Sequence, residues 1–385
     1  MGWVRTKALT TEQPPAPSLP RWLLAGVLMV IIGVLLFVLH ASGTVKMLSS
    51  MNIWWVSLMP AGCWLLIFCL RCYLWDRDLK AHQFLLKEAE YGQQQWEDWA
   101  GRWLAILGSG VLLPDNITAA HWGSERPQQY GLTRRINYLP AEEPVQLSAM
   151  HALLASTEAH VQCLPAELPM HITLVTDNPS PELTSSFSHL WKEHIPGRAV
   201  PDDITVTDSF SLSEVEERLK QPVLTVSLLL IIQLNGGTAY SDGLAALLLT
   251  SDDVARKYHL PHSSRLLRPM PLDMTNFEDD ITLFLETQTV ACRTPSVIGD
   301  AKKWTEKSAE LITLGGRANA PWKAEEITLL EKWCGMPGPA APWLLTALAA
   351  DLVSLRKQPL LALFSTKKEH FISTITPGSE DEYTG

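Results

Sequence analysis

The sequence is poor in charged residues and has no strongly basic segment. Asp, Glu, Lys and Arg make up 19% of its 385 residues, and the formal net charge is −10. Proteins that bind nucleic acid carry clustered Lys and Arg, because contacts to phosphate supply much of their affinity. Since no such cluster is present, we exclude nucleic acid as an expected partner.

Cysteine is also scarce. Three of the six cysteines lie in or beside an apolar segment near the N-terminus and three are scattered farther on, without a CxxC pair: Cys63, Cys69 and Cys72, then Cys163, Cys292 and Cys334. This pattern predicts no disulfide framework and is typical of a reducing compartment.

The sequence lacks the short motifs of common catalytic sites. It has no Walker-type phosphate loop, no GxGxxG after a strand, no GxSxG and no HExxH. His160 and Cys163 would share one side of a helix, but no further metal ligand follows at short spacing. Acidic pairs such as Asp252-Asp253 stand where helices are expected to begin, and we interpret them as caps. We predict no catalytic residue, no cofactor and no metal site.

Two long apolar runs are present near the N-terminus. Residues 22–39 and 53–70 are uncharged except at their flanks, and each is about as long as a helix that crosses the hydrocarbon core of a membrane. A cleaved signal peptide has a shorter apolar core. We therefore predict two retained transmembrane helices within residues 22–75, after a flexible leader at 1–21.

The distribution of Lys and Arg predicts the orientation of these helices. Lys46 is the single basic residue between the two apolar runs, whereas several precede the first run and follow the second. Both termini are therefore expected to be cytoplasmic, with residues 40–52 as a short hairpin on the other side. Gly26, Gly33 and Gly62 would allow close helix packing, so a membrane scaffold that forms homo-oligomers is one hypothesis.

A tryptophan-rich connector is expected at residues 76–110, helical to about residue 107. Trp96, Trp99 and Trp103 are spaced i, i+3 and i+7, which places them on one face of a helix. This face either packs against the domain that follows or is exposed to a membrane surface or a partner. We take these three residues as the candidate partner-binding face.

Residues 111–376 alternate between helix-like and strand-like runs, which predicts a soluble α/β fold of one or two domains. A short acidic tail follows at 377–385. Residues 260–276 show no clear helix or strand period. The expected strands are 170–176, 203–207, 222–234, 244–250, 359–364 and 370–376, and the expected helices are 143–161, 181–194, 211–220, 301–313, 323–333 and 343–355.

One stretch resembles a known fold. Residues 241–249, SDGLAALLL, followed by Ala255-Arg256, are similar to the small-residue turn, apolar strand and helix start of thiolase and ketoacyl-synthase folds. Active members of that superfamily have a cysteine nucleophile at a helix start, with partner histidines. Cys163 lies late in a helical run and the histidine motifs are missing, so the resemblance implies a catalytically inactive copy.

The overall layout resembles the type VI lipase adaptor family of bacterial secretion systems. The likeness is in two N-terminal spans, the segment YGQQQWEDWAGRW at 91–103 and a thiolase-like domain. It implies a non-enzymatic adaptor in the bacterial inner membrane, which binds a secretion effector or a component of the spike. The alternative hypothesis is a membrane-anchored enzyme of acyl or lipid metabolism, with Cys163, Cys292 or Cys334 as its nucleophile.

Overall fold

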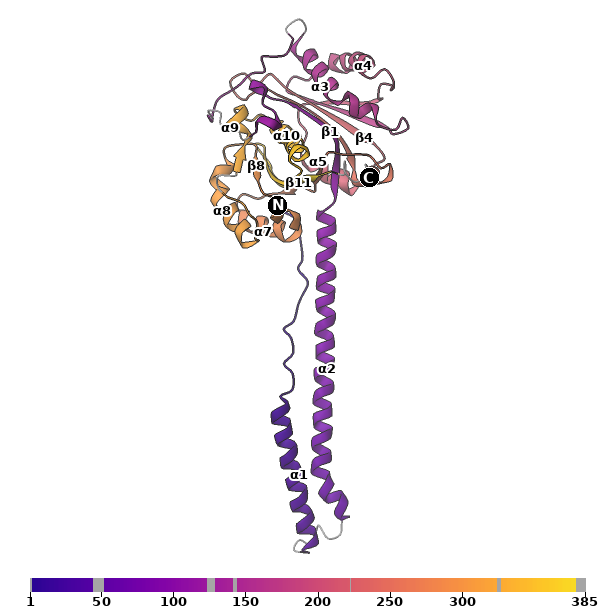
Figure 1. Cartoon of the computed structure of the whole chain (residues 1–385), viewed down its shortest axis with the longest axis vertical. Coiled ribbons are helices and arrows are strands. Elements are labelled where there is room, and N and C mark those ends of the chain that lie inside the picture. The colour runs from indigo at the N-terminus through magenta and orange to yellow at the C-terminus, as the bar shows by residue number, and fades with distance from the viewer. Residues whose placement is uncertain are drawn as a thin grey trace. The chain divides into compact units, whose positions relative to one another are not determined.

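The computed structural model describes residues 2–43, 52–122, 129–140, 144–221, 223–323 and 327–378 (Figure 1). The chain divides into two compact units. We call Arg5–Gln95 the helical unit, and Met1–Val4 together with Trp96–Gly385 the sheet unit. The centre of the expected hairpin and nearly all of the expected acidic tail lie outside the described residues.

The helical unit contains two helices that are long and apolar enough to cross a membrane, judged by length and composition: α1 (Leu19–Ala41) and α2 (Ile53–Ala100). They pack closely through two of the glycines that the sequence analysis assigned to self-association. A Cβ at Gly26 would lie 2.8 Å from the Trp64 ring, and a Cβ at Gly33 would collide with the Ser57 carbonyl oxygen. Small residues allow two helices to approach this closely.

The sheet unit is built from two halves with the same topology. In the first half the strand order is β3-β2-β4-β5-β1, with β5 antiparallel to its neighbours β4 and β1. Its elements are β1 (Trp103–Leu112), α3 (Val145–Gln162), β2 (Met170–Thr176), α4 (Glu182–His194), β3 (Asp203–Thr207), α5 (Ser213–Lys220), β4 (Val226–Gln233), β5 (Gly243–Ser251) and α6 (Asp252–Lys257).

The second half repeats this order as β9-β8-β10-β11-β6, again with the fifth strand, β11, antiparallel to its neighbours. Antiparallel pairing of β1 with β6 joins the two halves into one mixed sheet. The elements are β6 (Ser264–Leu267), β7 (Met270–Pro271), α7 (Phe277–Thr287), β8 (Val297–Gly299), α8 (Trp304–Arg317), β9 (Ile327–Leu329), α9 (Leu330–Cys334), α10 (Ala341–Arg356), β10 (Leu360–Ser365) and β11 (His370–Pro377).

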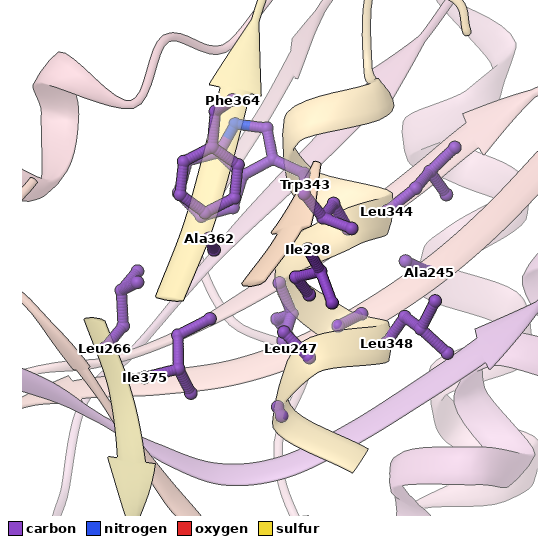
Figure 2. Close-up of a cluster of buried hydrophobic side chains, with 14 of the residues drawn as sticks. Ala245, Leu247, Leu266, Ile298, Trp343, Leu344, Leu348, Ala362, Phe364 and Ile375 are labelled. Carbon is purple, nitrogen blue, oxygen red and sulfur yellow. The ribbon is translucent and has the colours of Figure 1, made fainter. Parts of the chain in front are cut away.

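Three apolar clusters hold these elements in layers. The central cluster surrounds α5 and α10 and takes side chains from both halves of the sheet (Figures 1 and 2). The outer cluster of the first half lies under α3 and α4, and that of the second half lies under α7 and α8. Alternate residues of one strand face different clusters, as the period of a strand requires: Ala245 and Leu247 face the central one, and Leu244 and Ala246 an outer one.

The expected α/β architecture is confirmed, and the expected strands at 170–176 and 203–207 match β2 and β3 at both ends. Two expectations need correction. The helix expected to reach residue 107 ends at Ala100, and β1 begins at Trp103. The helix expected at 323–333 is β9 followed by α9, and the unassigned region 260–276 contains β6 and β7. In each case pairing with distant strands, which local periodicity does not report, decides the structure.

Close packing of α1 against α2 predicts a selective effect of enlarging Gly33. Gly33→Val should lower the free energy of unfolding of the helix pair by about 1–3 kcal/mol, because its side chain would meet backbone that cannot move aside. Gly62→Val is the matched control, since nothing lies within 4 Å of a Cβ at Gly62. Titration of the full chain from mild detergent into SDS measures both. Equal destabilisation by the two variants would contradict the packing.

Candidate functional site

Two of the three cysteines of the sheet unit, Cys292 and Cys334, lie in surroundings that disfavour the thiolate. Cys163 is exposed just after the end of α3. Cys292 is half-buried, and burial raises its pKa. Cys334 is buried in the central cluster, and burial raises its pKa as well. Because the thiolate is the reactive form, a raised pKa makes a cysteine a poorer nucleophile at neutral pH.

The three tryptophans of the candidate partner-binding face do not share one face. Trp96 and Trp99 lie in the last turn of α2, with ring centroids 5.4 Å apart. Trp103 opens β1 instead, where its ring stacks on His262 at 4.9 Å and lies under Arg265. The chain leaves the helix between Ala100 and Trp103. Helical spacing therefore does not place Trp103 on the same face as Trp96 and Trp99.

The end of α2 is held by buried polar side chains. Arg268 donates a hydrogen bond to the Trp99 carbonyl oxygen at 2.9 Å and another to Glu216 at 2.7 Å, and Gln288 donates to the Ala100 carbonyl oxygen at 3.0 Å. These carbonyl groups have no partner inside the helix, so a buried cation and an amide cap them. The Arg268 guanidinium also lies 4.1 Å from the centre of the Trp99 ring.

The acidic pairs have structural roles where the structure describes them. Ser251 caps α6 by accepting a hydrogen bond from the Val254 amide, and Asp252 binds Arg102. Asp280, in the first turn of α7, accepts a hydrogen bond from the Asp273 amide at 2.7 Å. Across the described ranges, no group of three or more His, Cys, Asp and Glu side chains could hold a metal ion.

Asp300 is a fully buried carboxylate at the carboxyl end of β8. It accepts hydrogen bonds from the Ser365 amide, from Ser365 Oγ at 2.6 Å and from Trp304 Nε1 at 3.0 Å. Burial nevertheless raises the pKa of Asp300 to about 6, since removal from water penalises its charged form more than the hydrogen bonds favour it. The residue ties the loop after β8 to the end of β10.

One cavity of the sheet unit brings polar side chains of several strands together. It has a volume of about 270 Å³ and lies beside the amino ends of β2, β3 and β4, next to the end of α5. Its lining residues are Leu104, His171, Asp203, Arg218, Gln221, Val223, Thr225, Ser227, Leu249, Thr250 and Ser251. Leu104 and Leu249 belong to the central cluster, so part of the wall is apolar.

Three of these residues form a row across neighbouring parallel strands. Asp203 on β3 and Ser227 on β4 are the register partners of His171 on β2. Register partners on adjacent strands point their side chains to the same face of a sheet. The row Asp203–His171–Ser227 therefore runs along the wall of the cavity.

The acidic member of the row is already in contact with the histidine. His171 Nδ1 lies 2.6 Å from Asp203 Oδ2. His171 Nδ1 is buried and makes no hydrogen bond of standard geometry. The Asp203 side chain is 71% exposed, so its carboxylate can rotate into alignment with Nδ1. No direct hydrogen bond joins Ser227 to His171 in the described chain.

Sequence reasoning assigned no role to His171 or Ser227, and it interpreted the acidic pair that contains Asp203 as a cap. His171 and Asp203 stand at the starts of two strands whose bounds it predicted, and Ser227 interrupts the apolar run of a third. The order in which the strands pair is what places the three side by side, and no local pattern carries that order.

No known protein family and no curated protein matches this sequence. Solved structures with a similar fold include an oxazolomycin ketosynthase domain from Streptomyces albus (12% identity, covering 72% of this chain and 95% of that one, TM-score 0.48). Others are cerulenin-bound OleA from Xanthomonas campestris (10%, 72% and 99%, 0.45) and the acyltransferase ChlB3 (13%, 71% and 97%, 0.45). The ketosynthase and OleA folds are thiolase-like, consistent with the expected thiolase-like domain.

The comparisons correct the main functional prediction. Ketosynthases, OleA and an acyltransferase are the proteins to which the fold is similar, and none of these three is a secretion adaptor. The prediction of a non-enzymatic type VI secretion adaptor is therefore wrong. At these identities the likeness concerns the fold, so activity has to be argued from the residues of this chain.

The raised pKa of Asp300 predicts a pH-dependent stability. The folded chain holds this proton more tightly than the unfolded chain, whose Asp has a pKa of about 3.9. The stabilisation is therefore complete below pH 4 and is lost as the pH rises through about 6. A pKa difference of about two units between the folded and unfolded chain corresponds to about 3 kcal/mol in the free energy of unfolding. Between pH 4 and 7 the free energy of unfolding should fall more for the parent chain than for Asp300→Asn.

Chemical denaturation of the full chain in detergent across this pH range measures the difference. Asp208→Asn, at an exposed position, is the control and should follow the parent chain. Parallel curves for the parent chain and Asp300→Asn would show that the Asp300 proton is not linked to folding.

Proposed function

We propose that this chain is a membrane-anchored enzyme that cleaves or transfers an acyl group held in an ester or thioester. The observation that supports this proposal is the row Asp203–His171–Ser227 along one wall of the 270 Å³ cavity. Ser227 is the nucleophile, His171 is the general base, and Asp203 orients the histidine and stabilises its positive charge. The same three roles occur on several unrelated folds.

Each residue is placed for its role by its strand. Asp203 contacts His171 through Nδ1, which leaves Nε2 as the nitrogen that can take a proton. Ser227 stands beside His171 on the other side, on β4. Because the two are not yet hydrogen-bonded, their side chains must rotate toward one another when substrate enters. Catalytic hydrogen bonds often tighten in this way only in the substrate complex.

The reaction proceeds in two balanced steps. Ser227 Oγ attacks the acyl carbonyl carbon while its proton passes to His171 Nε2. The bond to the alcohol or thiol breaks, and the leaving group takes that proton from His171. Water or a second alcohol then attacks the acyl-serine, loses its proton to His171 and releases the acyl product, and Ser227 Oγ recovers the proton.

The remaining cavity residues indicate the substrate class. Leu104, Leu249 and Val223 offer an apolar surface suited to an acyl chain, while Thr225 and Gln221 supply polar contacts at the same site. The two apolar helices would hold the enzyme at a bilayer, where acyl lipids are abundant. Burial raises the pKa of Cys292 and Cys334 and so disfavours either of them as the nucleophile, and we propose Ser227 in place of a cysteine.

A fluorophosphonate probe tests the nucleophile directly. The full chain in mild detergent should be labelled at Ser227, and Ser227→Ala should abolish labelling. His171→Ala should slow labelling by roughly 10²–10⁴, the usual contribution of a general base. Mass spectrometry of the labelled peptide identifies the residue, and short-chain nitrophenyl esters provide the accompanying rate.

Two controls separate this proposal from its competitors. Ser209→Ala changes an exposed serine outside the cavity and should leave labelling and hydrolysis at the parent level. Alkylation of the cysteines with iodoacetamide should also leave both unchanged. A chain that is not labelled at Ser227, or that loses hydrolysis on alkylation, would refute the serine mechanism.

A further inference from the structure

The N-terminal residues Gly2–Val4 belong to the sheet unit, although the whole helical unit separates them from the rest of it in sequence. Trp3 makes the contacts. Its ring meets Trp99 edge-on with centroids 5.0 Å apart and lies 5.8 Å from the ring of Phe284 on α7. It is half-buried and packs against the outer cluster of the second half.

The surface that receives Trp3 is rigid. Arg268 binds the Trp99 carbonyl oxygen and covers the Trp99 ring, and Phe284 is completely buried. Gly2 also fits closely, since a Cβ at this position would collide with the Asp280 carboxylate. The Asp280 side chain is itself held by the Asp273 amide. Position 2 therefore suits glycine, and the next residue, Trp3, supplies the aromatic ring that packs against Trp99 and Phe284.

We infer that Gly2–Val4 form an intramolecular clasp on the face made by Trp99 and Phe284. This face includes part of the surface that the sequence suggested for a partner. Trp3 of the same chain covers Trp99 there, so another protein would have to displace Trp3 to reach it.

The clasp also fixes the membrane topology. The chain leaves the sheet unit after Val4 and returns to it at Trp96, and two helices able to cross a membrane lie between these points. A compact unit lies on one side of a bilayer, so the chain between these points must cross an even number of times. A single crossing is therefore excluded: when one helix crosses, the other crosses as well, and the N-terminus is on the side of the sheet unit.

The packing of Trp3 predicts a sharp difference between two substitutions. The Trp3 indole N–H is buried and has no hydrogen-bond partner among the described residues, so Trp3 contributes to the clasp through ring contact. Trp3→Phe keeps a ring and removes the unsatisfied donor, and it should preserve the clasp. Trp3→Ala should release it.

Hydrogen exchange of the full chain in detergent measures how strongly the clasp protects the amides of α7. Trp3→Ala should speed the exchange of amides in Phe277–Thr287 by roughly ten-fold, and Trp3→Phe should match the parent chain. Unchanged exchange in Trp3→Ala would overturn the clasp. Equal acceleration by both variants would overturn the role assigned to ring packing. Neither result bears on the serine mechanism.

Membrane sidedness is the second test. Ala8→Cys, in the exposed segment before α1, and the native Cys163 of the sheet unit should react with an impermeant maleimide from the same side of sealed vesicles. Ala41→Cys, at the end of α1, should react from the opposite side. Reaction of positions 8 and 163 from opposite sides would exclude a clasp in the membrane-embedded protein.

Discussion

The pairing of β1 with both β5 and β6 is the constraint on which the sheet unit depends. Each half alone would leave the central face of its strands uncovered, because α10 packs on β1, β5, β6, β10 and β11 together. Joining the halves through β1 encloses α5 and α10 between them and buries the central cluster (Figure 2). The buried apolar area of that cluster, and not any single hydrogen bond, makes the joint stable. Since β1 follows α2 after only two residues, this long apolar helix leads directly into the strand that unites the fold.

The same topology creates the candidate site. Parallel pairing of β2 with β3 and with β4 sets three amino ends side by side, and register then decides which residues become neighbours. A shift of one residue would turn His171 to the opposite face from Asp203 and Ser227. The row thus rests on strand register, which is fixed by the apolar residues of β2 and β4 that alternate between the central and outer clusters.

Sequence patterns predicted the elements whose signals are local. The apolar stretches of α1 and α2, the strand at 170–176 and the start of α6 at Asp252 all follow from residues close together in the chain. They failed at β1, where Trp103 and Leu104 continue the spacing of a helix although they pair with Leu267 and Leu266. They also gave no information on strand order. His171, Asp203 and Ser227 are separated by dozens of residues, and only the sheet shows that they are neighbours.

The clasp packs Trp3 and Trp99 against one another. Two large apolar side chains can therefore stand beside polar segments of the chain. Trp99 is capped by Arg268 on one side and covered by Trp3 on another, so little of its ring needs to face water. In a bilayer the two crossings restrict where the N-terminus can go, and this lowers the entropy lost when Trp3 docks. An aromatic contact that would be weak between separate molecules becomes effective within one chain, because a high local concentration replaces a second binding partner. The membrane hairpin and the clasp therefore support one another.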